Sequence, residues 1–272
     1  MFQLKKIALE PITINDFPCM PEFEPPGWGD LVPRFRHAIS VNEYEPYKIT
    51  EQGRPVAIGT IIYHGDSAWL ASIIVHPDSR NKGYGKLITQ AMIDEIDTNQ
   101  YTTISLDATD LGFPVYKSLG FTHEATYAHF KSDENVTGLV LSTSIIPYRE
   151  DMLDQLLTMD RSVSCEDRKV HLSEHLAIAM VYFQSGKIGG FFLPSFGNGL
   201  IVAEDKVAGI ELLKYRLENN YFAIFPAENQ NAMEYLQHTS LKQFRLSRRM
   251  YIGQKRKWQA HCMYNRISGQ LG

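Results

Sequence analysis

The chain has 272 residues, of which 44% are hydrophobic and 21% are charged, and its formal net charge is −4. This length holds one large domain or two of ordinary size, and the composition is that of a soluble globular protein. The negative net charge argues against a general nucleic-acid-binding protein, and no apolar run approaches the ~18 residues of a membrane-spanning helix.

The cysteines and histidines give no sign of a disulfide framework or a metal site. Cys19, Cys165 and Cys262 lie far apart, and their spacing is typical neither of a disulfide framework nor of a metal site. The N-terminal segment has two lysines but lacks the apolar stretch of a secretory signal. His171 and His175 are four residues apart without the order of a metal-binding helix, and predict a helix with two surface histidines. We therefore expect a cytoplasmic protein that binds no metal.

The first predicted elements are a short strand and a helix start in residues 4–17. Thr13 and Asp16 have the spacing of a capping box, in which side chains satisfy the free N–H groups of a helix start. Residues 20–30, MPEFEPPGWGD, then form a loop rich in Pro and Gly that carries an exposed Trp28.

Residues 46–75 predict three strands, joined by turns in the sequences EQGRP and HGDSA. The periodicity changes after Gly85, where Ile88, Met92 and Ile96 recur with the spacing of an amphipathic helix. A strand, a short helix and another strand then follow, over residues 102–130. The first 130 residues thus predict one mixed α/β unit.

Residues 138–272 predict a second unit with the same order: a strand and helix, paired strands and a helix, and finally a strand, a short helix and a strand. Its counterpart of the Gly-rich turn contains Glu204 and Asp205, which would repel phosphate. We interpret it as a repeat that kept the fold and lost its ligand groups, the alternative being coincidental α/β alternation. The basic stretch of residues 245–257 predicts a solvated rim rather than an RNA or DNA site.

The stretch SRNKGYGK has the chemistry of an anion site. Gly83 and Gly85 allow a tight turn that brings N–H groups close to a ligand, and the helix start that follows attracts negative charge. Arg80, Lys82 and Lys86 add positive charge. The spacing fits neither a Walker A loop nor a dinucleotide-binding turn.

The context of this loop resembles the GNAT superfamily of acetyl-CoA-dependent N-acetyltransferases. The loop follows the predicted strand WLASIIVHP and precedes LDATDLGFPVYKSLGF. The resemblance covers residues 4–130 in element order and is sharpest over 69–87 and 106–121, while residues 138–272 match more loosely. The whole chain looks like a tandem GNAT protein with a degenerate second unit. Thr109 and Gly112 stand where the family often has Asn and Ala.

The resemblance implies a set of acetyl-CoA-binding residues. In the family the loop binds the pyrophosphate of coenzyme A through backbone N–H groups, and the preceding strand splays from its neighbour and binds the pantetheine arm. The corresponding positions are Ile73, Ile74 and Val75 for the arm, and Arg80, Asn81, Lys82, Gly83, Tyr84, Gly85 and Lys86 for the pyrophosphate.

The resemblance also places Tyr116 near the thioester sulfur, where its phenol could protonate the departing thiolate. The attacking amine must lose a proton, and backbone N–H groups near Val75 are candidates to stabilise the oxyanion. Trp28, Asp30 and Asp107 are candidate acceptor-site residues. The base is left open among Glu43, Glu45, His64, His76 and Asp107.

From these observations we expect an α/β protein with a mixed, mostly antiparallel sheet, made of a catalytic GNAT domain in 1–133 and a GNAT-like domain in 138–272. It should transfer acetyl from acetyl-CoA to the amine of a small molecule by direct attack, without nucleic acid or membrane partners. The second domain should form a wall of the acceptor site or the surface of a homodimer. The alternatives are a protein lysine or N-terminal acetyltransferase, and a non-catalytic acetyl-CoA sensor.

Overall fold

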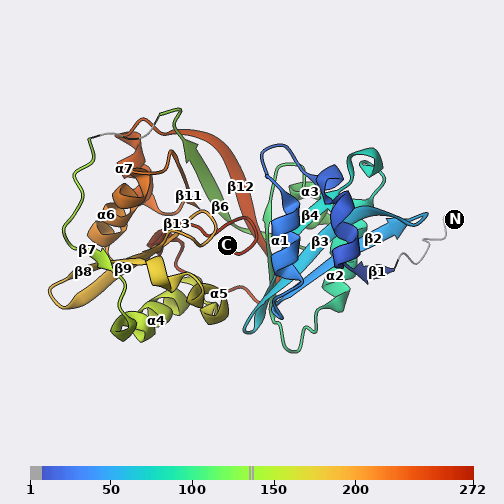
Figure 1. Cartoon of the computed structure of the whole chain (residues 1–272), viewed down its shortest axis with the longest axis horizontal. Helices are drawn as coiled ribbons and strands as arrows, with labels where there is room; N and C mark the ends of the chain where they lie inside the picture. The colour runs from blue at the N-terminus through green and yellow to red at the C-terminus, as the bar shows by residue number, and fades with distance from the viewer. Residues whose placement is uncertain (1–7, 135, 137) are drawn as a thin grey trace.

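The computed structural model describes residues 8–272 apart from 135 and 137. The strands of this part form an eight-stranded sheet in the order β1-β2-β3-β4-β5-β12-β6-β11 and a five-stranded sheet in the order β13-β10-β9-β8-β7. Helices cover the sheets in two lobes (Figure 1), and among the described residues no helix is long and apolar enough to cross a membrane. The mixed, mostly antiparallel α/β fold confirms the predicted fold class.

The strands of the larger sheet are β1 (Leu9–Pro11), β2 (Tyr44–Glu51), β3 (Arg54–His64), β4 (Ser67–Val75), β5 (Thr103–Ala108), β6 (Thr122–Lys131), β11 (Phe222–Pro226) and β12 (Lys242–Gly253). Those of the smaller sheet are β7 (Ile145–Pro147), β8 (Met180–Gln184), β9 (Lys187–Leu193), β10 (Leu200–Ala203) and β13 (Met263–Asn265). The α-helices are α1 (Leu31–Ala38), α2 (Tyr84–Glu95), α3 (Phe113–Ser118), α4 (Leu153–Ser164), α5 (Lys169–Ser173), α6 (Lys206–Leu217) and α7 (Gln230–Gln237). Short 3-10 helices are η1 (Ile14–Phe23), η2 (Pro77–Ser79), η3 (Glu150–Met152), η4 (Leu176–Ile178) and η5 (Ala260–Cys262).

The N-terminal segment follows the predicted capping pattern but continues differently. The Thr13 N–H donates to Asp16 Oδ2 at 2.8 Å, as a capping box requires. The helix that begins there is the 3-10 helix η1, which contains two prolines. The sequence also missed helix α1, which begins directly after the predicted loop. The Asp30 carboxylate caps it by accepting from the Val32 N–H at 2.8 Å. Phe35, on the helix itself, is fully buried.

The predicted three-stranded meander is confirmed as β2, β3 and β4, and the predicted amphipathic helix as α2. Ile88 and Met92 in α2, and Ile96 directly after it, are buried as expected and pack against one face of the sheet. On the opposite face, η1 and α1 cover Ile58 and Ile74. The remainder of that face packs against helices of the C-terminal half of the chain.

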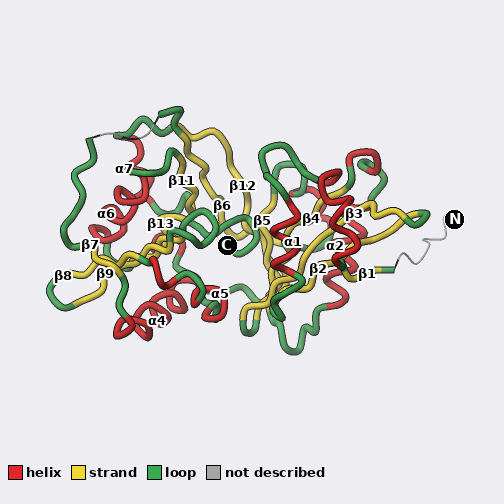
Figure 2. Tube along the Cα trace, in the orientation of Figure 1, coloured by secondary structure: helices red, strands yellow, loops and turns green. Residues whose placement is uncertain are grey.

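The two halves of the sequence share the larger sheet. β12 lies between β5 and β6, and β6 in turn lies between β12 and β11. The last strand that each half contributes to this sheet, β6 or β12, is therefore inserted between the last two strands that the other half contributes to it. In Figure 2 these long strands cross from one lobe toward the other. The exchange makes the sheet continuous across the sequence boundary at residues 134–137.

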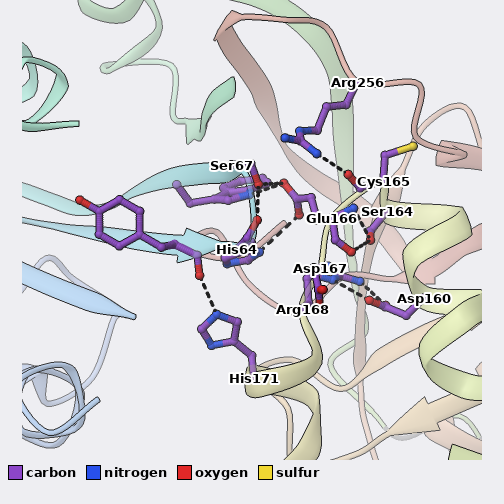
Figure 3. A network of polar contacts seen from close by, with 12 residues as sticks. His64, Ser67, Asp160, Ser164, Cys165, Glu166, Asp167, Arg168, His171 and Arg256 are labelled. Atoms are coloured by element: carbon purple, nitrogen blue, oxygen red, sulfur yellow. Dashed lines mark hydrogen bonds and ion pairs between the residues drawn. The ribbon is translucent and has the colours of Figure 1, made fainter. Parts of the chain in front are cut away.

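A buried polar network joins the halves beside this exchange (Figure 3). Glu166, in the turn between α4 and α5, is 1% exposed. Its Oε1 accepts from Trp69 Nε1 at 2.8 Å and from Ser67 Oγ at 3.3 Å, and its Oε2 lies 3.5 Å from His64 Nδ1. Since two of these partners are on β4, the network connects the C-terminal half to that strand.

The basic stretch predicted to be a solvated rim is in part buried, which corrects the prediction. Arg249 is 2% exposed and pairs with Glu124, with Nε 2.6 Å from Oε2. Its guanidinium lies between the rings of Trp69 and Trp258, 4.7 and 4.4 Å from their centroids. The sequence could not show this burial because Glu124 and Trp69 are distant from Arg249 along the chain. By contrast, Arg245 is exposed as predicted.

The predicted pair of surface histidines is also corrected. His171 is 6% exposed, and its Nε2 lies 3.1 Å from the carbonyl oxygen of Tyr63 (Figure 3). A carbonyl only accepts, so Nε2 carries the proton and Nδ1 accepts from the Tyr44 hydroxyl at 3.4 Å. Burial, together with the neighbouring His64, lowers the pKa of His171 to about 4.

We expect acidification to destabilise the protein through His171. An unfolded histidine titrates near pH 6.5 and His171 at about 4, so the unfolded state takes up the proton first. The stability contributed by neutral His171 is complete above pH ~6.5 and is lost as the pH falls toward ~4. Urea unfolding between pH 7.5 and 4.5 should show about 2 kcal/mol less loss in His171→Gln than in the wild type. The exposed His123→Gln should follow the wild type, and equal slopes in all three proteins would contradict this assignment.

Candidate functional site

The parallel strands β4 and β5 pair only where they begin. Their register runs from Ser67 and Thr103 to Trp69 and Ser105, after which the two strands separate, as the resemblance implied. The pairing of β3 with β4 shifts register near this point, and Ser72 has a φ of 50°. Such a β-bulge bends a strand and leaves backbone groups unpaired. The edge of β4 that faces β5 is therefore open to a ligand over its last residues, which include the predicted Ile73, Ile74 and Val75.

The loop after β4 turns the chain so that α2 begins beside this open edge. Asn81 and Gly83 have positive φ angles of 62° and 86°, a conformation that Asn and Gly tolerate best. Gly83 is the N-cap residue of α2, and no side chain caps the helix. A Cβ at Gly83 would meet nothing within 4 Å. The first N–H groups of α2 are thus available to a ligand.

Three cations surround the uncapped start of α2. Arg80, Lys82 and Lys86 are exposed, and none forms an ion pair with a carboxylate of the described residues. Arg80 Nε donates to the Val75 carbonyl at 3.4 Å, which ties the loop to the end of β4. By contrast, the Tyr84 side chain is buried and its pKa is raised by a hydrogen bond to Glu51. Unneutralised cations at a helix start form an anion site.

Tyr116 lies on α3, against the turn that begins the helix. A Cβ at Gly112 would be 2.7 Å from a ring carbon of Tyr116, so the glycine found in place of the family's Ala makes room for the phenol ring. The ring also meets Phe121 edge to face, with centroids 6.1 Å apart. Burial and the nearby Asp107 carboxylate raise the pKa of the Tyr116 hydroxyl above its usual range. The phenol therefore stays protonated and can donate a hydrogen bond.

Asp107, near the end of β5, is held by residues of the C-terminal half. Its Oδ2 accepts from Arg266 Nη1 at 2.6 Å and from Ser247 Oγ at 3.0 Å, and a Cβ at Gly269 would lie 3.2 Å from the same oxygen. Its Oδ1 is buried and has no hydrogen-bond partner in the described structure. Sequence reasoning missed Arg266 and Gly269, because nothing in their local pattern indicates contact with β5.

The loop before α1 and the helix itself bring further groups to β4. Trp28 is 36% exposed, and the guanidinium carbon of Arg34 lies 5.5 Å from its ring centroid. Asp30 is engaged as the cap of α1, as described above. Arg34 was missed because no local pattern predicted α1.

The structure gives most of the candidate bases other partners. Glu45 accepts from the hydroxyls of Tyr63 at 2.8 Å and Tyr47 at 3.1 Å. His64 is buried beside Glu166. His76 caps the turn η2 by accepting from the Asp78 N–H at 3.3 Å. The Glu43 carboxylate accepts no hydrogen bond from the described residues. Of the candidates, Asp107 keeps an oxygen without a partner near Tyr116.

These features define an α/β protein that can bind an elongated, anionic ligand where two parallel strands separate. Comparison with known proteins names the family. Residues 31–132 match the family model described as Acetyltransferase (GNAT) domain. These residues therefore form a GNAT acetyltransferase domain, as the resemblance predicted.

A curated relative, the ribosomal protein bS18-alanine N-acetyltransferase of Salmonella typhimurium, is 33% identical over 91 residues. The match covers 31% of this chain and 61% of the relative, so the chain spans less than two thirds of that protein's length.

Solved structures share the fold over nearly the whole chain. An acetyltransferase candidate from Pyrococcus horikoshii has a TM-score of 0.83 at 18% identity, with 100% of this chain and 98% of that chain covered. A tandem GNAT protein from the clavulanic acid biosynthesis pathway has a TM-score of 0.58 at 9% identity, with 91% and 98% covered. At these identities the likeness concerns the fold alone.

Proposed function

We propose that this protein is an acetyl-CoA-dependent N-acetyltransferase that acts on the primary amine of a small molecule by direct attack. The observation that carries the proposal is the separation of β4 and β5 beside the uncapped, cation-rich start of α2. An extended thioester cosubstrate with a pyrophosphate requires an open strand edge and an anion site that are adjacent.

The residues present fit acetyl-CoA. The N–H groups from Arg80 to Lys86 would hold the pyrophosphate, since Gly83 leaves open space at the helix start. The open edge of β4 at Ile73, Ile74 and Val75 would bind the pantetheine arm by backbone hydrogen bonds. When bound, acetyl-CoA supplies an activated acetyl group, which these contacts would direct toward α3.

Tyr116 would donate its hydroxyl proton toward the sulfur as negative charge develops there. A covalent cysteine route has less support, because a nucleophilic thiol needs a lowered pKa. Burial instead raises the pKa of Cys19, and that of Cys262 to about 11.

The division of the chain into a catalytic unit in 1–133 and a GNAT-like unit in 138–272 is part of the proposal. Under it, the second unit forms a wall of the acceptor site, which is supported by the contacts of Arg266 and Ser247 with Asp107. A homodimer surface is the alternative role for this unit.

A second candidate function is acetylation of a protein N-terminus. It is favoured by the 33% identity with an enzyme named for a ribosomal protein's alanine. A non-catalytic acetyl-CoA sensor is the third.

Release of free thiol from acetyl-CoA, measured with amino acids, polyamines, aminoglycosides and peptides as acceptors, tests the three functions together. The proposal predicts turnover with a small amine. Turnover confined to peptides would support the second candidate, and tight acetyl-CoA binding without turnover on any acceptor would support the sensor.

We expect Gly83→Ala to weaken acetyl-CoA binding about tenfold. An L-residue with the positive φ of Gly83 is strained by about 1–2 kcal/mol, and relief of that strain would move the N–H groups of the loop. Gly186, in the turn between β8 and β9, has a φ of 79° and equally open space. Gly186→Ala should therefore cost similar thermal stability without changing acetyl-CoA affinity. Calorimetric titration measures both affinities, and an unchanged value for Gly83→Ala would remove this loop from the binding site.

A further inference from the structure

Arg34 is a half-buried cation that lacks an acidic partner. No carboxylate of the described residues forms an ion pair with it, and the undescribed residues 1–7, 135 and 137 include no Asp or Glu. Burial lowers the pKa of its guanidinium, so the charge has lost hydration without gaining an anion. Because an unpaired, partly buried charge is costly, its position invites a negatively charged ligand.

The neighbours of Arg34 orient it without neutralising it. The Gln270 amide faces donors on Arg34, so its orientation follows from the hydrogen-bond network: with its oxygen toward the guanidinium, it accepts from Arg34 Nη1 at 3.0 Å and Nε at 3.2 Å. The same oxygen accepts from Ser72 Oγ at 2.7 Å. Trp28 lies against the guanidinium. A neutral amide leaves the positive charge in place and leaves further N–H groups of the fork free.

Ser72 connects this cation to the stretch of β4 at which the open edge begins. It is the residue of β4 with positive φ, between the paired start of the strand and the open edge. Arg34 is thus connected through Gln270 to the part of β4 that separates from β5.

The residue before Gln270 contacts a carboxylate, whose charge is opposite to that of Arg34. Gly269 precedes Gln270 in the chain and lies against Asp107, whose Oδ1 is buried without a partner. Adjacent Cα atoms are ~3.8 Å apart. The path from the Arg34 guanidinium through the Gln270 side chain and Gly269 therefore keeps that guanidinium within roughly 16 Å of the Asp107 carboxylate. Asp107 also lies close enough to Tyr116 to influence its hydroxyl.

We propose that the acceptor is a small amine that also carries a carboxylate, such as an amino acid, with its carboxylate on Arg34 and its amine directed toward Asp107 and Tyr116. This inference rests on the proposed acetyl transfer and names its substrate class. Arg34 and Asp107 would recognise the two opposite charges of such a molecule. A polyamine would place a positive charge against Arg34, and the N-terminus of a peptide lacks a carboxylate beside its amine.

The reaction at this site is an acyl transfer. The amine nitrogen, as the free base, forms a bond to the acetyl carbon, and the carbon–sulfur bond breaks with its electron pair moving to sulfur. The nitrogen loses one proton to solvent, and the sulfur gains one, so that the products are an N-acetylated amino acid and free coenzyme A. Asp107 binds the amine, while its Oδ2 remains paired with Arg266.

Matched acceptors with and without the carboxylate test the proposal in a thiol-release assay on the full chain. Suitable sets are alanine, alaninamide and ethylamine; phenylalanine and phenethylamine; and lysine and cadaverine. We expect kcat/KM to be at least about 30-fold higher for the best carboxylate-bearing acceptor than for its counterpart. In Arg34→Gln this preference should fall to within about threefold, with the acetyl-CoA KM unchanged.

Two variants control for structure. Arg36 is exposed on the same helix, so Arg36→Gln should keep the preference, and Arg34→Lys should restore part of it by restoring the charge. Turnover in which the preferred acceptors lack a carboxylate, or in which Arg34→Gln lowers both members of a pair equally, would overturn the inference while leaving the proposed function intact. Acetyl-CoA binding with no turnover on any acceptor would instead overturn the proposed function.

Discussion

Tyr116→Phe is expected to lower kcat about 100-fold or more while leaving the affinity for acetyl-CoA within about twofold of the wild type. The hydroxyl would donate a proton to the leaving sulfur, and loss of such a general acid typically costs a factor of 10²–10⁴. The ring would remain in place against Gly112 and Phe121. Steady-state thiol release and calorimetric titration measure the two quantities.

The pH profile adds a second readout for Tyr116. Because burial and Asp107 raise the pKa of the hydroxyl, the phenol stays protonated past pH 10, and the wild-type rate should show no alkaline decline from its ionisation up to that pH. Tyr101→Phe is a matched control, since this tyrosine stacks on Tyr63 at the start of β5. If Tyr116→Phe turns over as fast as Tyr101→Phe, Tyr116 has no part in the chemistry.

The elements that position the proposed cosubstrate could be predicted because their signals are local. Alternating hydrophobic residues and turn sequences predicted the three strands of residues 46–75, and the change of period after Gly85 predicted α2. The loop between them has Gly83 at a positive φ, where the chain turns into α2. Short-range sequence patterns therefore sufficed for this half of the site.

The acceptor side could not be predicted, since its contacts join distant parts of the sequence. Asp107 meets Arg266 across 159 residues, and Ser72 meets Gln270 across 198. No local period marks which strand will lie beside β5, so the insertion of β12 was not foreseen. Helix α1 was not predicted because the prolines and glycines that precede it indicate a loop. Arg34 thus became a candidate only when the fold placed it beside β4.

The exchange of strands makes the second half of the chain part of the proposed acceptor site. β12 supplies Ser247 to Asp107 and completes the sheet beside β5. Without it, one edge of β5 would be unpaired and the Asp107 carboxylate would lose a donor. The second half thus contributes to the geometry of the first, whether or not it binds a ligand itself.

Arg249→Leu is expected to lower the free energy of unfolding by about 3–5 kcal/mol, because it leaves the carboxylate of Glu124 buried without a partner. The Glu124 side chain is 3% exposed, and its Oε2 lies 2.6 Å from Arg249 Nε. Glu166 Oε1 lies 3.9 Å from Nη2 of the same guanidinium. The substitution also removes the cation between Trp69 and Trp258. Urea unfolding at pH 7.5 measures the change.

The neighbouring Arg248 provides the control for this prediction, since it pairs at 2.5 Å with Asp110, whose side chain is 77% exposed. A pair of this kind contributes about 0–1 kcal/mol, so Arg248→Leu should cost far less although the ion pair is as short. Arg249→Lys should be intermediate, and Glu124→Gln in the Arg249→Leu background should recover part of the loss through their coupling. Equal destabilisation by Arg248→Leu and Arg249→Leu would mean that burial does not set the strength of these pairs.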